Sequence, residues 1–221
     1  MKVTLMPYQP GWREDFICHR RVIEQALSSL EPVVEHIGST SLGDIVAKPI
    51  IDVLVGLRED QSLDRVVEPL LDAGYTYIEQ FNAGMPYRRF FAKLVPLQDR
   101  PPPRILGEGQ VLAFGREYNS VANIHVLAWG SRHWTRHIAF RDYLRAHDQV
   151  RQSYAALKLK IAEMDFDDPL DYNAYKEDFI AECQEKALAW LARVSGPAAL
   201  EDQAWISGGQ GWRRHTTKEG G

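Results

Sequence analysis

The chain has 221 residues, with 45% hydrophobic residues, 25% charged residues and a formal net charge of −4. This length and composition fit one ordinary soluble domain with a short appendage. The slight negative charge offers no general attraction to nucleic acid or anionic membranes, so an anion site would need a local cluster of basic groups. No apolar run approaches the roughly 18 residues that span a bilayer, and no signal peptide is recognisable, so a cytoplasmic protein without nucleic-acid or membrane partners is predicted.

The N-terminal part of the chain alternates strand and helix patterns. Val3–Met6 is predicted as a short strand, and apolar residues at helical spacing predict a helix from Trp12 to Leu30. Strands are then predicted at Val33–Ile37 and Ile50–Leu57. The second of these is a nearly continuous apolar run, which is typical of a strand that is covered on both faces.

The middle of the chain predicts a second helix and more strands. Leu63 to Leu71 has helical spacing, with Ser62 or Asp60 as its N-cap and Gly74 just past its end. Short strands are predicted at Tyr75–Ile78, Tyr87–Val95 and Val121–Ala128. Between the last two, the Pro- and Gly-rich segment 96–119 predicts a surface excursion with a short strand at Val111–Phe114.

From Ser131 the apolar period becomes helical, and the glycine-rich residues 196–221 lack any period. We therefore predict an α/β (α+β) fold in which a mixed β-sheet is flanked by helices and followed by a helical C-terminal segment. Residues 1–195 form the domain, with the sheet core over about 1–130 and the helical segment over about 131–195. Residues 196–221 are predicted to be a flexible tail.

The stretch from His36 to Leu57 carries the strongest functional signal. Gly38 allows a ligand to approach the backbone, and three hydroxyl side chains follow it that can donate to phosphate oxygens: Ser39, Thr40 and Ser41. Asp52 interrupts the apolar strand, and a buried carboxylate is costly unless donors or a cation meet it. Lys48 or a metal ion would serve, while nearby backbone donors at a sheet edge are the alternative. The P-loop and dinucleotide-binding glycine motifs are both absent.

Other polar residues have both a functional and a structural reading. Arg89 and Lys93 lie on one strand face and are predicted to bind phosphate, with simple solvation as the alternative. His125 shares a strand face with Asn123 and is either a site residue or a satisfied core histidine. The remaining candidates lie on predicted helices, where solvation is again the alternative for the basic residues: Arg141, Arg145, Tyr154, Lys158 and Lys176.

Seven short motifs, spread over roughly residues 3 to 193, occur together in this chain. They are His36-Ile-Gly-Ser-Thr-Ser, Ala47-Lys-Pro-Ile-Ile-Asp52, Gly74-Tyr75, Ile124-His-Val126, Phe140-Arg-Asp-Tyr-Leu-Arg145, Tyr154-Ala-Ala-Leu-Lys158 and Tyr175-Lys176. Together they resemble the GrpB family, which is placed in the nucleotidyltransferase-fold superfamily and whose domain is also fused to some dephospho-CoA kinases. The resemblance implies a mixed sheet flanked by helices and a nucleotide-dependent activity.

The superfamily pattern is only partly matched. Its members carry Asp-x-Asp on the strand after Gly-Ser, and Asp52 supplies one acid, whereas Ile50 and Leu54 stand at the two possible partner positions. The strand with Asn123 and His125 is the counterpart of the one that bears the third acid. We therefore predict His36, Asp52 and His125 as catalytic residues and as ligands of a divalent metal, either Mg²⁺ or Mn²⁺ or a transition metal, which a mixed nitrogen and oxygen set suits.

Three interpretations follow. The first is a nucleotidyltransferase-like enzyme that binds a nucleoside triphosphate with a divalent metal and transfers a nucleotidyl or phosphoryl group to, or activates, a small-molecule acceptor. Gly38 to Ser41 and Lys48 would cradle the phosphates. The second is a catalytically degenerate protein that binds a nucleotide or another phosphorylated metabolite, as the missing second carboxylate suggests. The third is an interaction module linked to coenzyme A metabolism.

Overall fold

Five strands form one mixed sheet in the order β1-β2-β5-β4-β3. Their bounds are Val33–Ile37 (β1), Ile51–Leu57 (β2), Thr76–Tyr77 (β3), Arg89–Pro96 (β4) and Tyr118–Ala128 (β5). The central pair, β2 and β5, is parallel, and the other neighbours are antiparallel. The computed structural model describes residues 3–111, 115–166 and 171–205. Over these residues the predicted mixed sheet flanked by helices is confirmed.

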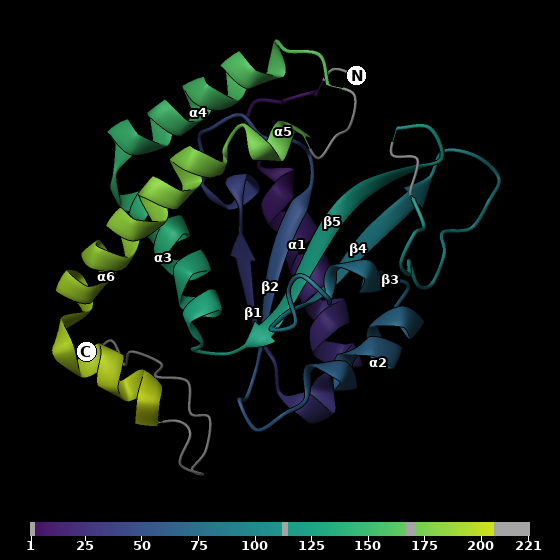
Figure 1. Cartoon of the computed structure of the whole chain (residues 1–221), viewed down its shortest axis with the longest axis horizontal. Helices are drawn as coiled ribbons and strands as arrows, with labels where there is room; N and C mark the ends of the chain where they lie inside the picture. Colours follow the sequence, from purple (N-terminus) through teal and green to yellow (C-terminus); the bar gives the residue numbers. More distant parts are fainter. Residues whose placement is uncertain (1–2, 112–114, 167–170, 206–221) are drawn as a thin grey trace, which may run out of the picture.

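Helices cover both faces of the sheet, and the C-terminal ones curve around its β1 side in Figure 1. Within the described ranges, the α-helices are Gly11–Ala26 (α1), Val67–Asp72 (α2), Arg132–Ala146 (α3), Asp148–Ala162 (α4), Asp171–Ala174 (α5) and Glu177–Trp205 (α6). Short 3-10 turns lie at Ser28–Leu30, Ser39–Ser41, Leu63–Val66 and Glu79–Phe81. None of the helices, as far as the chain is described, has the length and apolar character that a bilayer crossing needs.

Alternation along β2 separates two different faces of the sheet. Val53 and Val55 are fully buried in the main core, which α1 and α2 help to form. Leu54 points the other way and packs against Trp134 of α3. The strand is therefore buried on both sides, as its apolar run predicts. Asp52 belongs to the Leu54 face, which we call the α3 face.

The structure also corrects some predicted boundaries. Val3–Met6 is not a strand, since only Met6 forms a bridge, to Ala47, and Pro7 has no N–H to continue one. The β4–β5 hairpin continues to the pair Pro96↔Tyr118, so the excursion is shorter than predicted. Of the predicted strand Val111–Phe114, Val111 is not in a strand and residues 112–114 lie outside the described residues. Helix α6 spans Glu177–Trp205 and so includes residue 195; the domain end at that residue stays a prediction.

Candidate functional site

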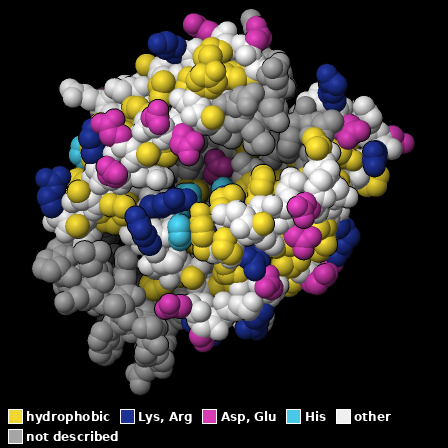
Figure 2. Space-filling view, viewed as in Figure 1, with side chains coloured by type: hydrophobic (Ala, Val, Ile, Leu, Met, Phe, Trp, Pro, Cys, Tyr) yellow, Lys and Arg dark blue, Asp and Glu magenta, His cyan; other side chains and the backbone are white. Residues whose placement is uncertain are grey.

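Asp52 lies at the centre of a polar group on the α3 face. Its register partner on β5 is Asn123, whose Nδ2 donates to Asp52 Oδ1 at 3.0 Å. The Nε2 atom of His125 lies 3.9 Å from the same oxygen. The Asp52 side chain remains 29% exposed. Figure 2 shows this side of the molecule hollowed between the C-terminal helices and the sheet, with an acidic side chain on the floor of the hollow.

Gly38 is fixed by its closeness to this carboxylate. A Cβ atom at position 38 would lie 2.2 Å from Asp52 Oδ2, far inside van der Waals contact. The residue also has φ +70° and ψ −175°, a conformation that is essentially restricted to glycine. The side chain of Asp52 makes the close approach at Gly38 in this structure, where a ligand is expected from the sequence.

Three lysines from three parts of the chain lie near one another, and two of them, Lys48 and Lys176, are close enough to Asp52 to sense its charge. The ammonium groups of Lys48 and Lys176 lie 4.2 Å and 4.3 Å from the ring centroid of Tyr172, so they share one aromatic ring. Lys158 is only 2% exposed; its Nζ donates to the carbonyl of Val46 and lies 4.7 Å from the ring of Tyr154. We refer to Lys48, Lys158 and Lys176 as the lysine cluster.

Burial and mutual repulsion weaken the hold of these lysines on their protons. Burial, together with the charge of Lys176, lowers the pKa of Lys158 to about 7. Burial also lowers the pKa of Lys176 to about 8, with Lys48 acting in the same direction and Asp52 against it. The pKa of Lys48 is lowered by burial and raised by Asp52. Among the described residues, none of the three forms an ion pair with a carboxylate. The lysine cluster is thus a group of amines that hold their protons less firmly than usual and, within the described ranges, are not paired with carboxylates.

Ser39 connects the turn after β1 to this cluster. Its side chain lies close enough to the hydroxyl of Tyr154 to act against the rise that burial causes in the pKa of that phenol; Tyr154 lies on α4 and stacks on Phe179 with ring centroids 5.4 Å apart. Burial raises the pKa of Tyr154 to about 12, so the phenol stays protonated at neutral pH. Two of the predicted binding residues, Ser39 and Tyr154, therefore lie together and are close enough to Asp52 to sense its charge.

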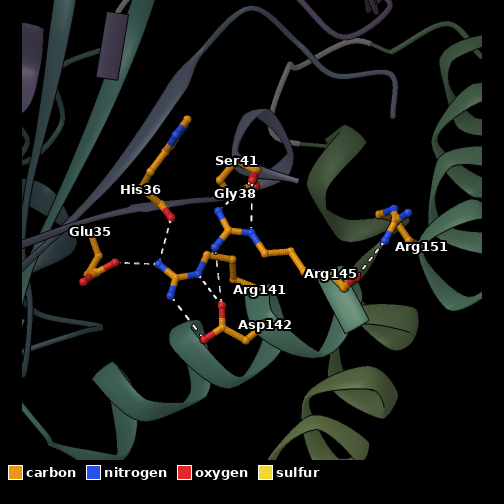
Figure 3. Close-up of polar contacts among 8 residues, drawn as sticks. All are labelled: Glu35, His36, Gly38, Ser41, Arg141, Asp142, Arg145 and Arg151. Carbon is orange, nitrogen blue, oxygen red and sulfur yellow. Dashed lines mark hydrogen bonds and ion pairs between the residues drawn. The ribbon is translucent and has the colours of Figure 1, made fainter. Parts of the chain in front are cut away.

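Arg141 and Arg145 hold the turn from α3, as Figure 3 shows. Arg141 Nη1 donates to Glu35 Oε2 at 2.7 Å and to the carbonyl of His36 at 3.1 Å. Arg145 donates from Nε at 3.2 Å and Nη2 at 2.8 Å to the carbonyl of Ser41. These bonds bind the two arginines to the protein itself. Arg141 thereby links α3 to β1, and Arg145 links α3 to the end of the Gly38–Ser41 turn.

Several predicted site residues are not brought to Asp52. His36 pairs with Val53 and so lies on the opposite face, where its ring stacks on Phe16 with centroids 4.6 Å apart. Its Nε2 hydrogen-bonds with Thr40, which is 3% exposed. Burial lowers the pKa of His36 to about 4, so it is a neutral core histidine at pH 7. Ser41 donates to the carbonyl of Gly38 and also serves the turn.

Arg89 and Lys93 also lie on the face away from Asp52. Both alternate with the residues of β4 that face His125, and Arg89 forms a 2.6 Å ion pair with Asp64. Lys93 donates to the carbonyl of Gly74 at 2.9 Å. The residue that does reach the α3 face is Arg88, whose Nη1 lies 3.3 Å from His125 Nδ1. Arg88 and Tyr172 are not among the candidate site residues predicted from the sequence.

The predicted metal ligands do not fit a metal centre. His36 is separated from Asp52 and His125 by the sheet, and the described residues include no group of three or more His, Cys, Asp or Glu side chains that could hold a metal ion. One oxygen of Asp52 already accepts from Asn123, and the nearby ammonium groups would repel a cation. The arrangement is one carboxylate, Asp52, with basic side chains near it.

The geometry can be set beside known proteins. The family model described as GrpB protein matches residues 2–186. The UPF0157 protein YqkA of Bacillus subtilis (strain 168) is 29% identical over 189 residues, which cover 86% of this chain and 48% of YqkA. A dephospho-CoA kinase of Mycolicibacterium paratuberculosis is 30% identical over 199 residues, covering 85% of this chain and 46% of the kinase. The chain thus spans about half the length of these two relatives.

A solved structure agrees with the family match. The crystal structure of the conserved protein GrpB from Enterococcus faecalis has 29% sequence identity and a TM-score of 0.65, and the match covers 84% of this chain and 98% of that one. Sequence and fold therefore give the same answer. This chain belongs to the GrpB family.

Proposed function

We propose that this protein binds a phosphorylated small molecule, a nucleoside triphosphate by the family resemblance, on the α3 face, with the phosphates held by the lysine cluster. The observation that carries the proposal is the charge balance at Asp52. Lys48 and Lys176 both sense the charge of this single carboxylate, Lys158 senses the charge of Lys176, and burial lowers the pKa of each lysine. A ligand that brings negative charge would stabilise their protonated forms.

The neighbouring groups suit a phosphate ester. Ser39 and Tyr154 offer hydroxyl groups beside the cluster, and the ammonium groups of Lys48 and Lys176 lie 4.2 Å and 4.3 Å from the ring centroid of Tyr172. The hydroxyl of Tyr172 is buried and has no hydrogen-bond partner among the described residues. An unsatisfied buried donor is costly, so a ligand oxygen that accepted from it would contribute to affinity.

Binding without a metal-dependent transfer step is the function that the geometry supports best. A triphosphate that arrived with Mg²⁺ would meet Asp52 as the one carboxylate at this site among the described residues. His125 is poorly placed to act as a base, because Nδ1 contacts Arg88 and Nε2 faces Asp52. Nucleotidyl or phosphoryl transfer to a small-molecule acceptor is the competing outcome of the experiment below.

Isothermal titration of ATP into the protein, once with EDTA and once with Mg²⁺ or Mn²⁺, tests the proposal. We expect binding in EDTA that weakens about tenfold or more in Lys176→Gln, because a hydrogen bond to a charged group contributes about 1.5–3 kcal/mol. The matched control is Lys160→Gln, an exposed lysine on α4 that should bind like the wild type.

Two results would contradict the proposal. One is that neither ATP nor inorganic triphosphate, titrated in the same way, binds to the protein in EDTA or with the divalent ion. The other is equal affinity in wild type and Lys176→Gln. If a product of nucleotidyl or phosphoryl transfer forms only with the divalent ion, the enzymatic interpretation replaces the binding proposal.

A further inference from the structure

A second group of basic side chains lies on the α3 face beside His125, apart from the lysine cluster. Arg88 comes from the residue before β4, and His133, Arg136 and His137 come from α3. Spacings of three and four residues put these three on one side of the helix. Figure 2 shows Lys or Arg side chains with a histidine beside the hollow, over the position of α3.

These basic groups have no acidic partner within the part of the chain that the structure describes. Neither Arg88 nor Arg136 forms an ion pair there, although acidic residues outnumber basic ones in the sequence, 30 to 26. The Nε atoms of both arginines and Nδ1 of His133 are buried without a hydrogen-bond partner. Buried polar atoms are nearly always satisfied in folded proteins, so two guanidinium donors and one ring nitrogen without a partner in one cluster call for a ligand.

The four groups are close enough to act on one another. Burial lowers the pKa of Arg88, and Arg136 adds to this effect. Burial lowers the pKa of His137 to about 3, with His125, Arg136, Arg88 and His133 acting in the same direction. The ring of His137 lies 5.8 Å from that of His125, which connects the group to the Asp52 site.

Aromatic rings shape the surroundings of this group. Tyr87 stacks on His133 with centroids 3.5 Å apart and an interplanar angle of 6°. The guanidinium of Arg88 lies 4.9 Å from the ring centroid of Phe90. These contacts fix one arginine and one histidine in position without using their hydrogen-bond donors.

We propose that Arg88, His133, Arg136 and His137 form a second anion subsite, which binds a phosphate group other than the one held by the lysine cluster. The group belongs either to a second substrate or to the far end of the same ligand. Guanidinium groups suit this role because their donors match phosphate oxygens in pairs. The second subsite deepens the proposed function. It rests on that function only in taking the lysine cluster as the first phosphate site.

Histidine ring NMR of the full chain tests the subsite directly. Proton–nitrogen correlation spectra would be recorded at pH 7 in EDTA during titration with inorganic phosphate, and His133→Asn and His137→Asn would assign the two signals. We expect both signals to shift with a saturable phosphate dependence. Arg136→Gln should weaken the apparent affinity about tenfold or more. The matched control is Arg21→Gln, an exposed arginine on α1, which covers the other face of the sheet.

The two proposals fail separately. Lys176→Gln should leave the phosphate response of His133 and His137 unchanged, whatever it does to ATP binding. Absence of a histidine response in the wild type, or an equal response in Arg136→Gln, would overturn the subsite. If Arg136→Gln has a lowered melting temperature that indicates unfolding, Arg88→Gln provides the same test with the same expected loss.

Discussion

The two faces of the sheet are built from alternate residues of the same strands, yet they differ in chemistry. One face joins α1 and α2 in an apolar core that includes Val53, Val55 and Ile124. The other starts apolar at Leu54 and Leu127 and then becomes polar at Asp52 and Asn123. Moving by one residue along β2 thus changes the environment from core to site.

Polar residues on the two faces differ in how completely the protein satisfies their hydrogen bonds. His36, on the core face, is neutral, stacked and hydrogen-bonded to Thr40, so its polar groups are satisfied by the protein. On the α3 face, Arg136 and the hydroxyl of Tyr172 retain buried polar atoms without a partner among the described residues. These unsatisfied groups, rather than polarity alone, are the reason that the proposed ligand is placed on the α3 face.

The largest effect on stability is expected for Gly38→Ala, at the turn that contacts Asp52. The new Cβ would collide with Asp52 Oδ2, and the positive φ would add strain of about 1–3 kcal/mol. Urea unfolding should show a stability loss larger than that of Gly43→Ala. Gly43 also has a positive φ, +97°, but a Cβ there meets no atom within 4 Å. Equal losses of stability in the two variants would show that the Asp52 carboxylate does not require glycine at position 38.

A smaller effect is expected in the pH dependence of the unliganded protein. The pKa of Lys158 is lowered from 10.5 to about 7, so the unfolded chain binds more protons between these values. Stability should therefore rise as the pH increases from about 7 toward 10, by at most about 1.4 kcal/mol per pH unit for this group. Thermal unfolding of wild type and Lys158→Met over this range measures the difference. Parallel pH profiles would argue against a buried, weakly protonated Lys158.

The smallest effect is expected from Arg89→Gln, on the core side of β4. Its ion pair is with Asp64, whose side chain is 65% exposed, so the loss of stability should not exceed about 1 kcal/mol. ATP affinity measured by calorimetry should match the wild type. A tenfold weaker affinity would place a ligand contact on the face that we assign to the core.

The sequence predicted those features that depend on local pattern. Period-two alternation placed Asn123 and His125 on one face, and the apolar run placed Asp52 within a buried strand. It did not distinguish Arg88 from Arg89, because a shift of one residue exchanges the two faces of a strand. The position of His36 depends on the register between β1 and β2, which a single sequence does not encode locally. Tyr172 resembled an ordinary residue of an apolar helix stripe.

Proton uptake on ligand binding tests the central claim most directly. ATP would be titrated into the protein at pH 8 in EDTA, in two buffers with different ionisation enthalpies. The pKa of Lys158 is about 7 and that of Lys176 is about 8, so both are partly deprotonated at pH 8. A bound phosphate favours their charged forms, and the protein should therefore take up on the order of one proton from the buffer. Lys158→Met should reduce this uptake. Binding with no net proton uptake, or with the same uptake in Lys158→Met, would contradict the assignment of the lysine cluster as the phosphate site.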